Sequence, residues 1–141
     1  TEADALIAAT GARVNIGGGE AFYSPSHDFV QVPPQAAFHE PINWYRTALH
    51  ELGHWTGHTS RLDREQKGGF GSESYAKEEL VVEMAAAFTC ASLGIAPTVR
   101  HSDYIASWLS VLQNDEKAIF RAASQATRAS DFLLAFAGGD Q

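Results

Sequence analysis

The amino-acid sequence predicts one α+β domain, in which a mainly helical body packs beside a small N-terminal β-sheet or hairpin. The chain has 141 residues, of which 45% are hydrophobic and 19% charged, and this supplies enough apolar material for a single core. Short β-type segments lie between residues 21 and 32, while helical patterns with start and stop residues fill most of the remainder. No apolar run approaches the length of a membrane span.

The N-terminal segments come first in this prediction. Residues 1–10 form a short helix that Gly11 ends. Ala21–Tyr23 and Phe29–Val32 are two short strands, because the segment between them is rich in turn-forming residues. Pro33-Pro34 closes the second strand, since proline cannot donate to a β-ladder.

Four longer helical elements make up the expected body. Pro41 suits the first turn of a helix that runs to Thr56 and stops at Gly57. A polar loop covers residues 60–72, and further helices run from 72–74 to 94, from 102 to 113 and from 115 to 136. The last two helices carry apolar residues at helical spacing, which predicts core packing. These residues are Trp108, Leu109, Leu112, Ile119, Phe120, Phe132, Leu133 and Phe136.

Charge and cysteine content limit the classes of function. The formal net charge is −7, whereas a domain that grips nucleic acid by itself is usually basic. We therefore expect any contact with nucleic acid to be made by another domain. Cys90 is the only cysteine, which excludes an internal disulfide and fits a cytoplasmic location. The apolar residues around it favour a buried structural role. Because the chain does not start with Met, we expect it to be part of a longer protein.

The motif His50-Glu51-Leu52-Gly53-His54 carries the expected chemistry. Two histidines four residues apart lie on one face of a helix, so both imidazoles can reach one zinc ion at ~2.0–2.1 Å. Glu51 lies at the edge of that face, where it can take a proton from the activated water without being a ligand. Apolar residues on the other sides of the helix predict that it is buried and that the histidines face a cleft. These are Trp44, Tyr45, Ala48, Leu49, Leu52 and Trp55.

A catalytic zinc ion needs a third protein ligand, and the second long helix offers carboxylates. Its segment from residue 80 to 88 is apolar apart from Glu83, which predicts a buried helix. A buried carboxylate needs a positive partner, so we expect Glu79 to be the third ligand. Glu83, one turn further on, then accepts the ring N–H of a ligating histidine. The exchange of these two roles stays open, and Glu78 is expected to be a solvated charge near Lys77.

Other histidines fit the third position poorly. His58 extends the row of histidines, but it lies about 6 Å further along the helix axis than His54, too far for a common ion. The metzincin pattern would place its third histidine at position 60, where this sequence has Ser60.

Two further parts of a peptidase site have candidates. Tyr75 lies one helical turn before Glu79 and is the first candidate for stabilising the oxyanion, with His58 and Arg61 as alternatives. A purely structural role for Tyr75 also stays open. The segment 29–32 is either the exposed strand edge to which an extended substrate adds or a simple cover of the core.

The sequence around these residues resembles the zincin-like metallopeptidase domain of polyvalent mobile-element proteins. That domain forms the C-terminal part of ArdC-type antirestriction proteins, and related stretches occur in TraC-type plasmid primases. The similarity covers almost the whole chain and is much more specific than the short histidine motif alone. It rests on residues 50–58, then Ser60-Arg61-Leu62-Asp63-Arg64, Phe70-Gly71-Ser72 and Tyr75-Ala76-Lys77-Glu78-Glu79-Leu80-Val81-Val82-Glu83.

The resemblance implies a gluzincin-like zinc site with His50, His54 and a glutamate from segment 78–83. It also implies that a domain binding single-stranded DNA normally precedes this one, and that the full protein protects incoming plasmid or phage DNA from host restriction. Two functions follow as expectations. One is a zinc metallopeptidase acting on a protein or peptide. The alternative is a non-catalytic, metal-stabilised module that docks its acidic surface on a DNA-processing or restriction partner.

Overall fold

The computed structural model describes residues 1–69, 72–96, 99–113 and 115–138, and only the backbone of residues 99–102. Residues 70–71 of the expected loop and Pro97 lie outside this part. The elements follow in the order α1 (Glu2–Ala9), β1 (Val14–Ile16), β2 (Phe22–Ser24), β3 (Phe29–Val32), the 3-10 turn η1 (Gln35–Ala37), α2 (Pro41–Trp55), α3 (Glu73–Ser92), α4 (Val99–Val111) and α5 (Glu116–Ala137). The expected α+β class with a mainly helical body is confirmed.

The sheet differs from the prediction in one strand and in its order. Its three strands are arranged β1-β3-β2, with β1 parallel and β2 antiparallel to β3. Of the two alternatives for segment 29–32, the exposed strand edge is wrong, because β3 is the central strand and its Val30 and Val32 are fully buried. The strand β1 was not predicted, since three residues before a glycine turn give too short an alternation to detect.

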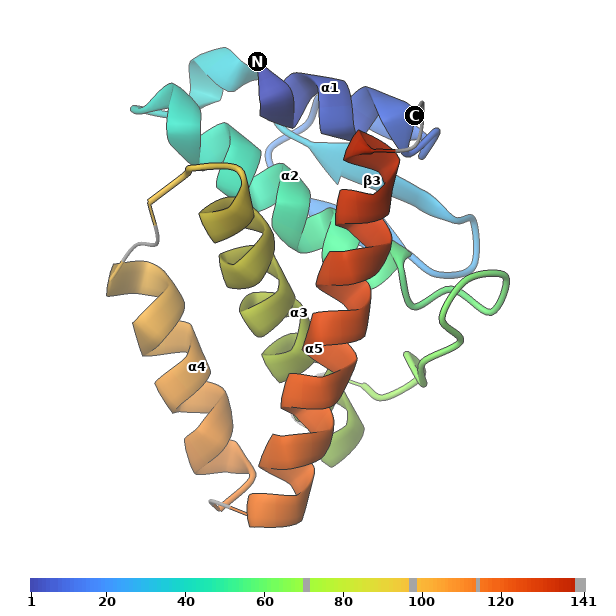
Figure 1. Ribbon diagram of the computed structural model, residues 1–141, viewed down its shortest axis with the longest axis vertical. Helices are drawn as coiled ribbons and strands as arrows, with labels where there is room; N and C mark the ends of the chain where they lie inside the picture. Colours follow the sequence, from blue (N-terminus) through green and yellow to red (C-terminus); the bar gives the residue numbers. More distant parts are fainter. Residues whose placement is uncertain (70–71, 97–98, 114, 139–141) are drawn as a thin grey trace.

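The helices begin where the sequence offers capping groups. Pro41 occupies the first turn of α2, the Ser72 side chain accepts from the Tyr75 amide at the start of α3, and Asp115 caps α5 in the same way. The helix α3 packs against α2, α4 and α5, and Figure 1 shows it between α4 and α5. The sheet packs on α2, and α1 packs on α5.

The close approach of α2 and α3 depends on a glycine inside the histidine motif. A Cβ added at Gly53 would lie 3.0 Å from Cγ1 of Val82 on α3. Gly53 and Val82 are both buried, so a larger residue would meet the neighbouring helix. The missing side chain therefore lets α3 lie directly against the face of α2 that carries the histidines.

The predicted core holds in most positions but not in all. Leu112 and Leu133 are buried, as is Cys90. Phe120 is 74% exposed, which contradicts its expected place in the core, and Phe88 on α3 is 42% exposed. Helical spacing identifies a face of a helix but not how far its neighbour extends along it.

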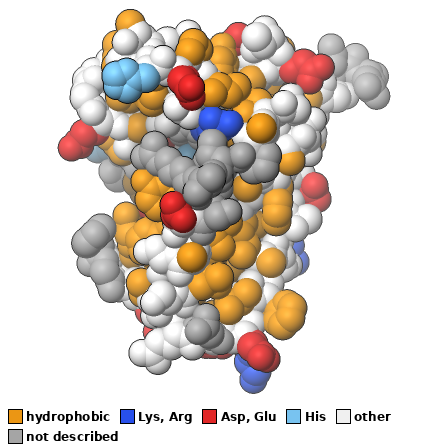
Figure 2. All heavy atoms as spheres, turned by 90° about the vertical axis from the view of Figure 1, so that its left-hand side faces the viewer, with side chains coloured by type: hydrophobic (Ala, Val, Ile, Leu, Met, Phe, Trp, Pro, Cys, Tyr) orange, Lys and Arg blue, Asp and Glu red, His pale blue; other side chains and the backbone are white. Residues whose placement is uncertain are grey.

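Hydrophobic side chains are spread over much of the face in Figure 2. None of the helices formed by the described residues is both long and apolar enough to cross a membrane.

Candidate metal centre

Three donor groups from two helices meet at one point. His50 and His54 on α2 face Glu79 on α3, and one ligand atom of each lies within 4.8 Å of the others. His50 Nε2 lies 3.3 Å from Glu79 Oε2, and His54 Nε2 lies 3.4 Å from Glu79 Oε1. All three side chains are largely buried, with 13–20% of each exposed. The structure therefore brings together the three residues that the sequence suggested as ligands.

The spacing of these atoms suits a metal ion. Ligands at ~2.0–2.1 Å from a tetrahedral zinc ion are about 3.3–3.4 Å from one another. The two nitrogen-to-oxygen separations have this value, although both are longer than a good hydrogen bond. Two imidazole nitrogens and a carboxylate oxygen are also a common donor set for divalent transition metals. By donor type and by their convergence within 4.8 Å, the residues present thus fit a divalent metal.

A second carboxylate orients each imidazole. His50 Nδ1 lies 2.7 Å from Glu83 Oε1, and His54 Nδ1 lies 3.0 Å from Glu78 Oε2. Each ring therefore donates from Nδ1 to a carboxylate and turns Nε2 towards the shared point, the arrangement found around metal-binding histidines. Glu83 occupies the place that the sequence suggested for it. The expected role of Glu78 as a solvated charge is wrong, because only 8% of its surface is exposed.

The Glu78 carboxylate is held by residues from the loop after α2. Arg64 Nε donates to its Oε1 at 2.9 Å, and Gln66 Nε2 donates to its Oε2 at 3.0 Å. Arg64 Nη2 also donates to the Gly53 carbonyl at 2.7 Å, and Gln66 to the His54 carbonyl at 2.6 Å. The loop thereby satisfies carbonyls at the end of α2 and fixes the partner of His54.

Without metal, the site holds protons between its carboxylates. Burial by itself lowers the pKa of His50, but hydrogen bonds with Glu79 and Glu83 outweigh burial and raise it to about 10. Burial likewise opposes the hydrogen bonds of His54 with Glu78 and Glu79, which raise its pKa to about 9. Burial would raise the pKa of Glu79, yet both imidazoles hold it far below its usual value. A divalent cation can take the place of this positive charge.

Glu51 differs from the other acids of the site. It is 8% exposed, and burial, the largest influence, raises its pKa above the ordinary value. Its carboxylate forms no hydrogen bond or ion pair with any residue that the structure describes. A buried carboxylate with raised basicity beside a metal site is suited to accept a proton.

The cleft beside these residues has two lobes that share Ala21, His50, Glu51 and Glu79. The first, here named the α2 lobe, has a volume of about 340 Å³ and is also lined by Asn43, Arg46, Thr47, Glu83, Tyr104 and Trp108. The second, the β2 lobe, has about 310 Å³ and is also lined by Phe22, Tyr23, Pro25, His54, Gln66, Gly68, Ser74, Tyr75 and Glu78. The strand beside the site is therefore β2, an edge of the sheet, and not β3.

The candidates for stabilising an oxyanion occupy different places. Tyr75 lines the β2 lobe, and its ring packs edge-on against Trp108 with centroids 5.6 Å apart. Burial, followed by the charge and a hydrogen bond of Glu79, raises the pKa of Tyr75 to about 12, so its hydroxyl keeps its proton at neutral pH. His58 and Arg61 line neither lobe. His58 Nδ1 pairs with the Ser60 hydroxyl at 2.8 Å instead.

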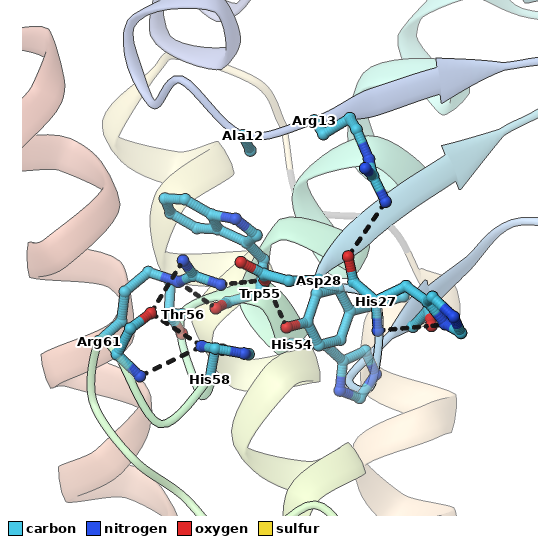
Figure 3. A network of polar contacts seen from close by, with 12 residues as sticks. Ala12, Arg13, His27, Asp28, His54, Trp55, Thr56, His58 and Arg61 are labelled. Atoms are coloured by element: carbon cyan, nitrogen blue, oxygen red, sulfur yellow. Dashed lines mark hydrogen bonds and ion pairs between the residues drawn. The ribbon is translucent and has the colours of Figure 1, made fainter.

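Arg61 belongs to a network that joins the sheet to the end of α2. Its Nε donates to the Trp55 carbonyl at 2.6 Å, and its guanidinium lies 3.9 Å from the centre of the Trp55 ring. Its Nη2 forms an ion pair with Asp28, which also accepts from the Tyr23 hydroxyl at 2.7 Å. Figure 3 shows Arg61 beside Trp55 and directed towards Asp28. This network holds strand β2 next to the helix that carries the histidines.

Comparison with known proteins places this site in a family. A family model described as zincin-like metallopeptidase matches residues 1–125. A DNA primase TraC of Escherichia coli is 48% identical over 136 residues, which make up 95% of this chain and 13% of the primase. A protein of Sinorhizobium fredii is 44% identical over 135 residues, or 94% of this chain and 44% of that protein.

Solved structures show the same fold. The crystal structure of the antirestriction protein ArdC from a plasmid, with Mn(II) bound, matches with a TM-score of 0.85 and 42% identity over 99% of this chain and 53% of ArdC. Its metal-free structure matches with a TM-score of 0.81, 41% identity, and coverage of 98% of this chain and 51% of ArdC. This chain spans about half or less of the length of each of these relatives. The family match over residues 1–125, together with the histidine and glutamate arrangement, shows that this chain belongs to the zincin-like metallopeptidase family.

Proposed function

We propose that this chain is the catalytic domain of a metal-dependent peptidase, with His50, His54 and Glu79 as ligands of a zinc ion. The observation that supports this most directly is the combination of the three converging donors with the unpaired Glu51 carboxylate, which lines both lobes of the same cleft. A site that only stabilises the fold has no use for such a carboxylate. The Mn(II) in the related ArdC structure supports a divalent metal, and the donor spacing fits zinc.

The residues of the chain divide the chemistry among them. When bound, the metal acts as a Lewis acid and brings the pKa of water close to 7. Glu51 accepts a proton from the attacking water and later donates it to the leaving amine, which its raised pKa favours. Tyr75 keeps its hydroxyl proton and donates a hydrogen bond to the oxyanion that forms on the peptide carbonyl. Glu83 and Glu78 hold the two imidazole rings in position.

The edge of β2 supports an extended substrate. Its residues Phe22 and Tyr23 line the lobe that contains the metal centre, and within the described part of the chain β2 pairs with β3 alone. An extended peptide can add to the other side of β2 as a further strand. Main-chain hydrogen bonds to β2 would then hold the peptide backbone beside Glu51.

We further propose that the domain acts within a longer antirestriction or mobile-element protein in the cytoplasm, on a protein or peptide partner. The similarity to ArdC and to TraC primases supports this context. The net charge of −7 favours leaving contact with single-stranded DNA to a separate N-terminal domain.

A non-catalytic, metal-stabilised docking module is the second candidate, and the acidic charge favours it. Structural zinc sites are closed by four protein ligands. The described residues provide a cluster of three donors, and Glu51 faces the cleft beside them. These features favour the peptidase.

The test compares Glu51→Gln with the wild-type protein on a library of peptides derived from a proteome, with cleavage read by mass spectrometry. We expect metal-dependent cleavage by the wild type, loss of at least about a hundredfold in rate in Glu51→Gln, and equal metal content in both. The exposed Glu65→Gln is the matched control and should keep full activity. Persistent cleavage by Glu51→Gln, or no metal-dependent cleavage by the wild type, would contradict the proposal.

A further inference from the structure

The two lobes of the cleft differ in chemistry. Aromatic and apolar side chains of Phe22, Tyr23, Pro25 and Tyr75 dominate the β2 lobe. The α2 lobe contains polar side chains and Arg46, which is the only Lys or Arg among the described residues that line either lobe. A substrate that runs through both lobes therefore meets different surroundings on the two sides of the metal centre.

Arg46 is placed next to the reacting groups by the periodicity of α2. It lies four residues before His50, so both side chains project from the same face of the helix one turn apart. This is a separation of about 6 Å along the axis, close to the length of two residues of an extended peptide. A group bound to Arg46 therefore lies near, but not at, the peptide bond that the water activated by Glu51 would attack.

Among the described residues, the guanidinium of Arg46 has only neutral hydrogen-bond partners. Its Nη1 donates to Asn43 Oδ1 at 2.9 Å, and its Nη2 donates to the Ala96 carbonyl, also at hydrogen-bond distance (2.5 Å). Its Nε is buried and makes no hydrogen bond within the described part of the chain. No carboxylate of a described residue forms an ion pair with it. Within the described part of the chain, its positive charge is therefore not engaged in a direct ion pair.

Three acids also line the α2 lobe, and each has a partner or a proposed role other than binding Arg46. Glu79 and Glu83 lie against the two nitrogens of His50. Glu51 is the proposed base. An arginine in a partly desolvated wall that forms no ion pair with a described acid can bind an incoming carboxylate, because its planar guanidinium offers that group charge-assisted hydrogen bonds. Figure 2 shows only a few, scattered Lys and Arg side chains on the face that it presents.

We propose that the α2 lobe binds a substrate carboxylate through Arg46, so that the peptidase selects peptides with an acidic group on one side of the scissile bond and an apolar side chain in the β2 lobe. This inference rests on the proposed peptidase function. The carboxylate comes either from an Asp or Glu side chain or from the C-terminus of the substrate. Both have the same chemistry towards a guanidinium.

Binding of small hydroxamates to the metal-loaded protein tests the proposal without needing turnover. Hydroxamates ligate divalent metals, so a chain of two to four methylene groups ending in a carboxylate or in the isosteric amide samples the α2 lobe. We expect the acid to bind about tenfold more tightly than the amide at one chain length, measured by isothermal titration calorimetry. Two hydroxamate peptides then distinguish the source: one has Asp and an amidated end, and the other has Ala and a free C-terminus.

Variants test whether Arg46 causes the preference for the acid over the amide. Arg46→Gln should bind acid and amide equally, whereas Arg46→Lys keeps the charge and should keep part of the preference. The exposed Arg128→Gln on α5 makes the same charge change away from the cleft and should behave as the wild type. If Arg46→Gln fails to fold, the comparison of Arg46→Lys with the wild type still reports the preference.

The outcomes separate this inference from the function on which it rests. If neutral acetohydroxamate and all longer probes fail to bind the metal-loaded wild type, both the proposed metal centre and this inference are refuted. If neutral probes bind but the acids bind no better at any length, the metal centre stands and the role of Arg46 is refuted. An acid preference that survives in Arg46→Gln also refutes it.

Discussion

Replacing Glu78 by glutamine tests the least expected feature of the site. Glu78 accepts from His54 at 3.0 Å, from Arg64 at 2.9 and 3.2 Å and from Gln66 at 3.0 Å. Glu78 and Arg64 are 8% and 9% exposed, so the variant would leave a buried guanidinium without its counter-charge. The amide nitrogen of glutamine would also face donors, because His54, Arg64 and Gln66 all donate to this carboxylate.

The magnitude follows from the burial of the pair. Removing one partner of a buried ion pair costs roughly 3–5 kcal/mol, and the remaining amide oxygen places Glu78→Gln near the lower end, at about 3 kcal/mol. For a chain of this length that lowers the melting temperature by about 10 °C. The pKa of Glu78 is lowered, since the hydrogen bonds from His54 and Arg64 outweigh the effect of burial. The carboxylate therefore stabilises the fold above the ordinary glutamate pKa and loses this effect as pH falls through its lowered value.

The assay is urea denaturation of metal-free wild type and Glu78→Gln at neutral and acidic pH, followed by metal titration. The difference in unfolding free energy should shrink in acid, and metal affinity should fall about 10–100-fold because His54 loses its orienting partner. Glu73→Gln is the control, since the Glu73–Lys77 pair is exposed and 3.6 Å apart and should contribute less than about 0.5 kcal/mol. Equal stability of the two variants would refute the reasoning.

Three other changes test separate parts of the structure. Gly53→Ala gains about 1 kcal/mol of helix propensity but loses roughly 1–3 kcal/mol to overpacking against Val82. Urea denaturation should therefore show an unfolding free energy about 1 kcal/mol below that of the wild type, and an added Val82→Ala should restore part of it. Asp28→Asn removes the charge that pairs with Arg61 and should cost about 1–2 kcal/mol in thermal unfolding with metal affinity unchanged; a fall in metal affinity would show that the network acts on the site itself. Tyr75→Phe should lower kcat about a hundredfold on a cleaved peptide without changing metal content, and an unchanged kcat would leave Tyr75 with a packing role alone.

The parts that could be predicted from the sequence depend on short-range rules. The spacing of His50 and His54 determines a common helix face, and Pro41 and Gly57 bound the helix within one or two residues. The apolar segment after Glu79 predicts that α3 is buried and that its acids need positive partners. These inferences need only the geometry of one helix and the cost of burying charge.

The failures share one cause, which is the position of a partner distant in sequence. Glu78 follows Lys77 and precedes Glu79, and nothing in that local pattern reveals that Arg64 and Gln66 fold back to bury it. Phe120 fits the apolar face of α5 but reaches beyond its neighbours to solvent. Helical periodicity describes one surface of an element and carries no information about where the opposing surface ends.

By itself, the sequence determined which residues can carry metal chemistry and which helix faces present them, because those properties follow from residue type and from 3.6 residues per turn. Only the tertiary structure decided which carboxylate meets which imidazole, that β2 and not β3 is the strand edge at the cleft, and that Arg46 lines the cleft without an ion pair to a described acid. The reason is physical: these outcomes depend on how closely α3 approaches α2 at Gly53 and on the order in which three short strands pair. Both are set by long-range packing, which local sequence patterns do not encode.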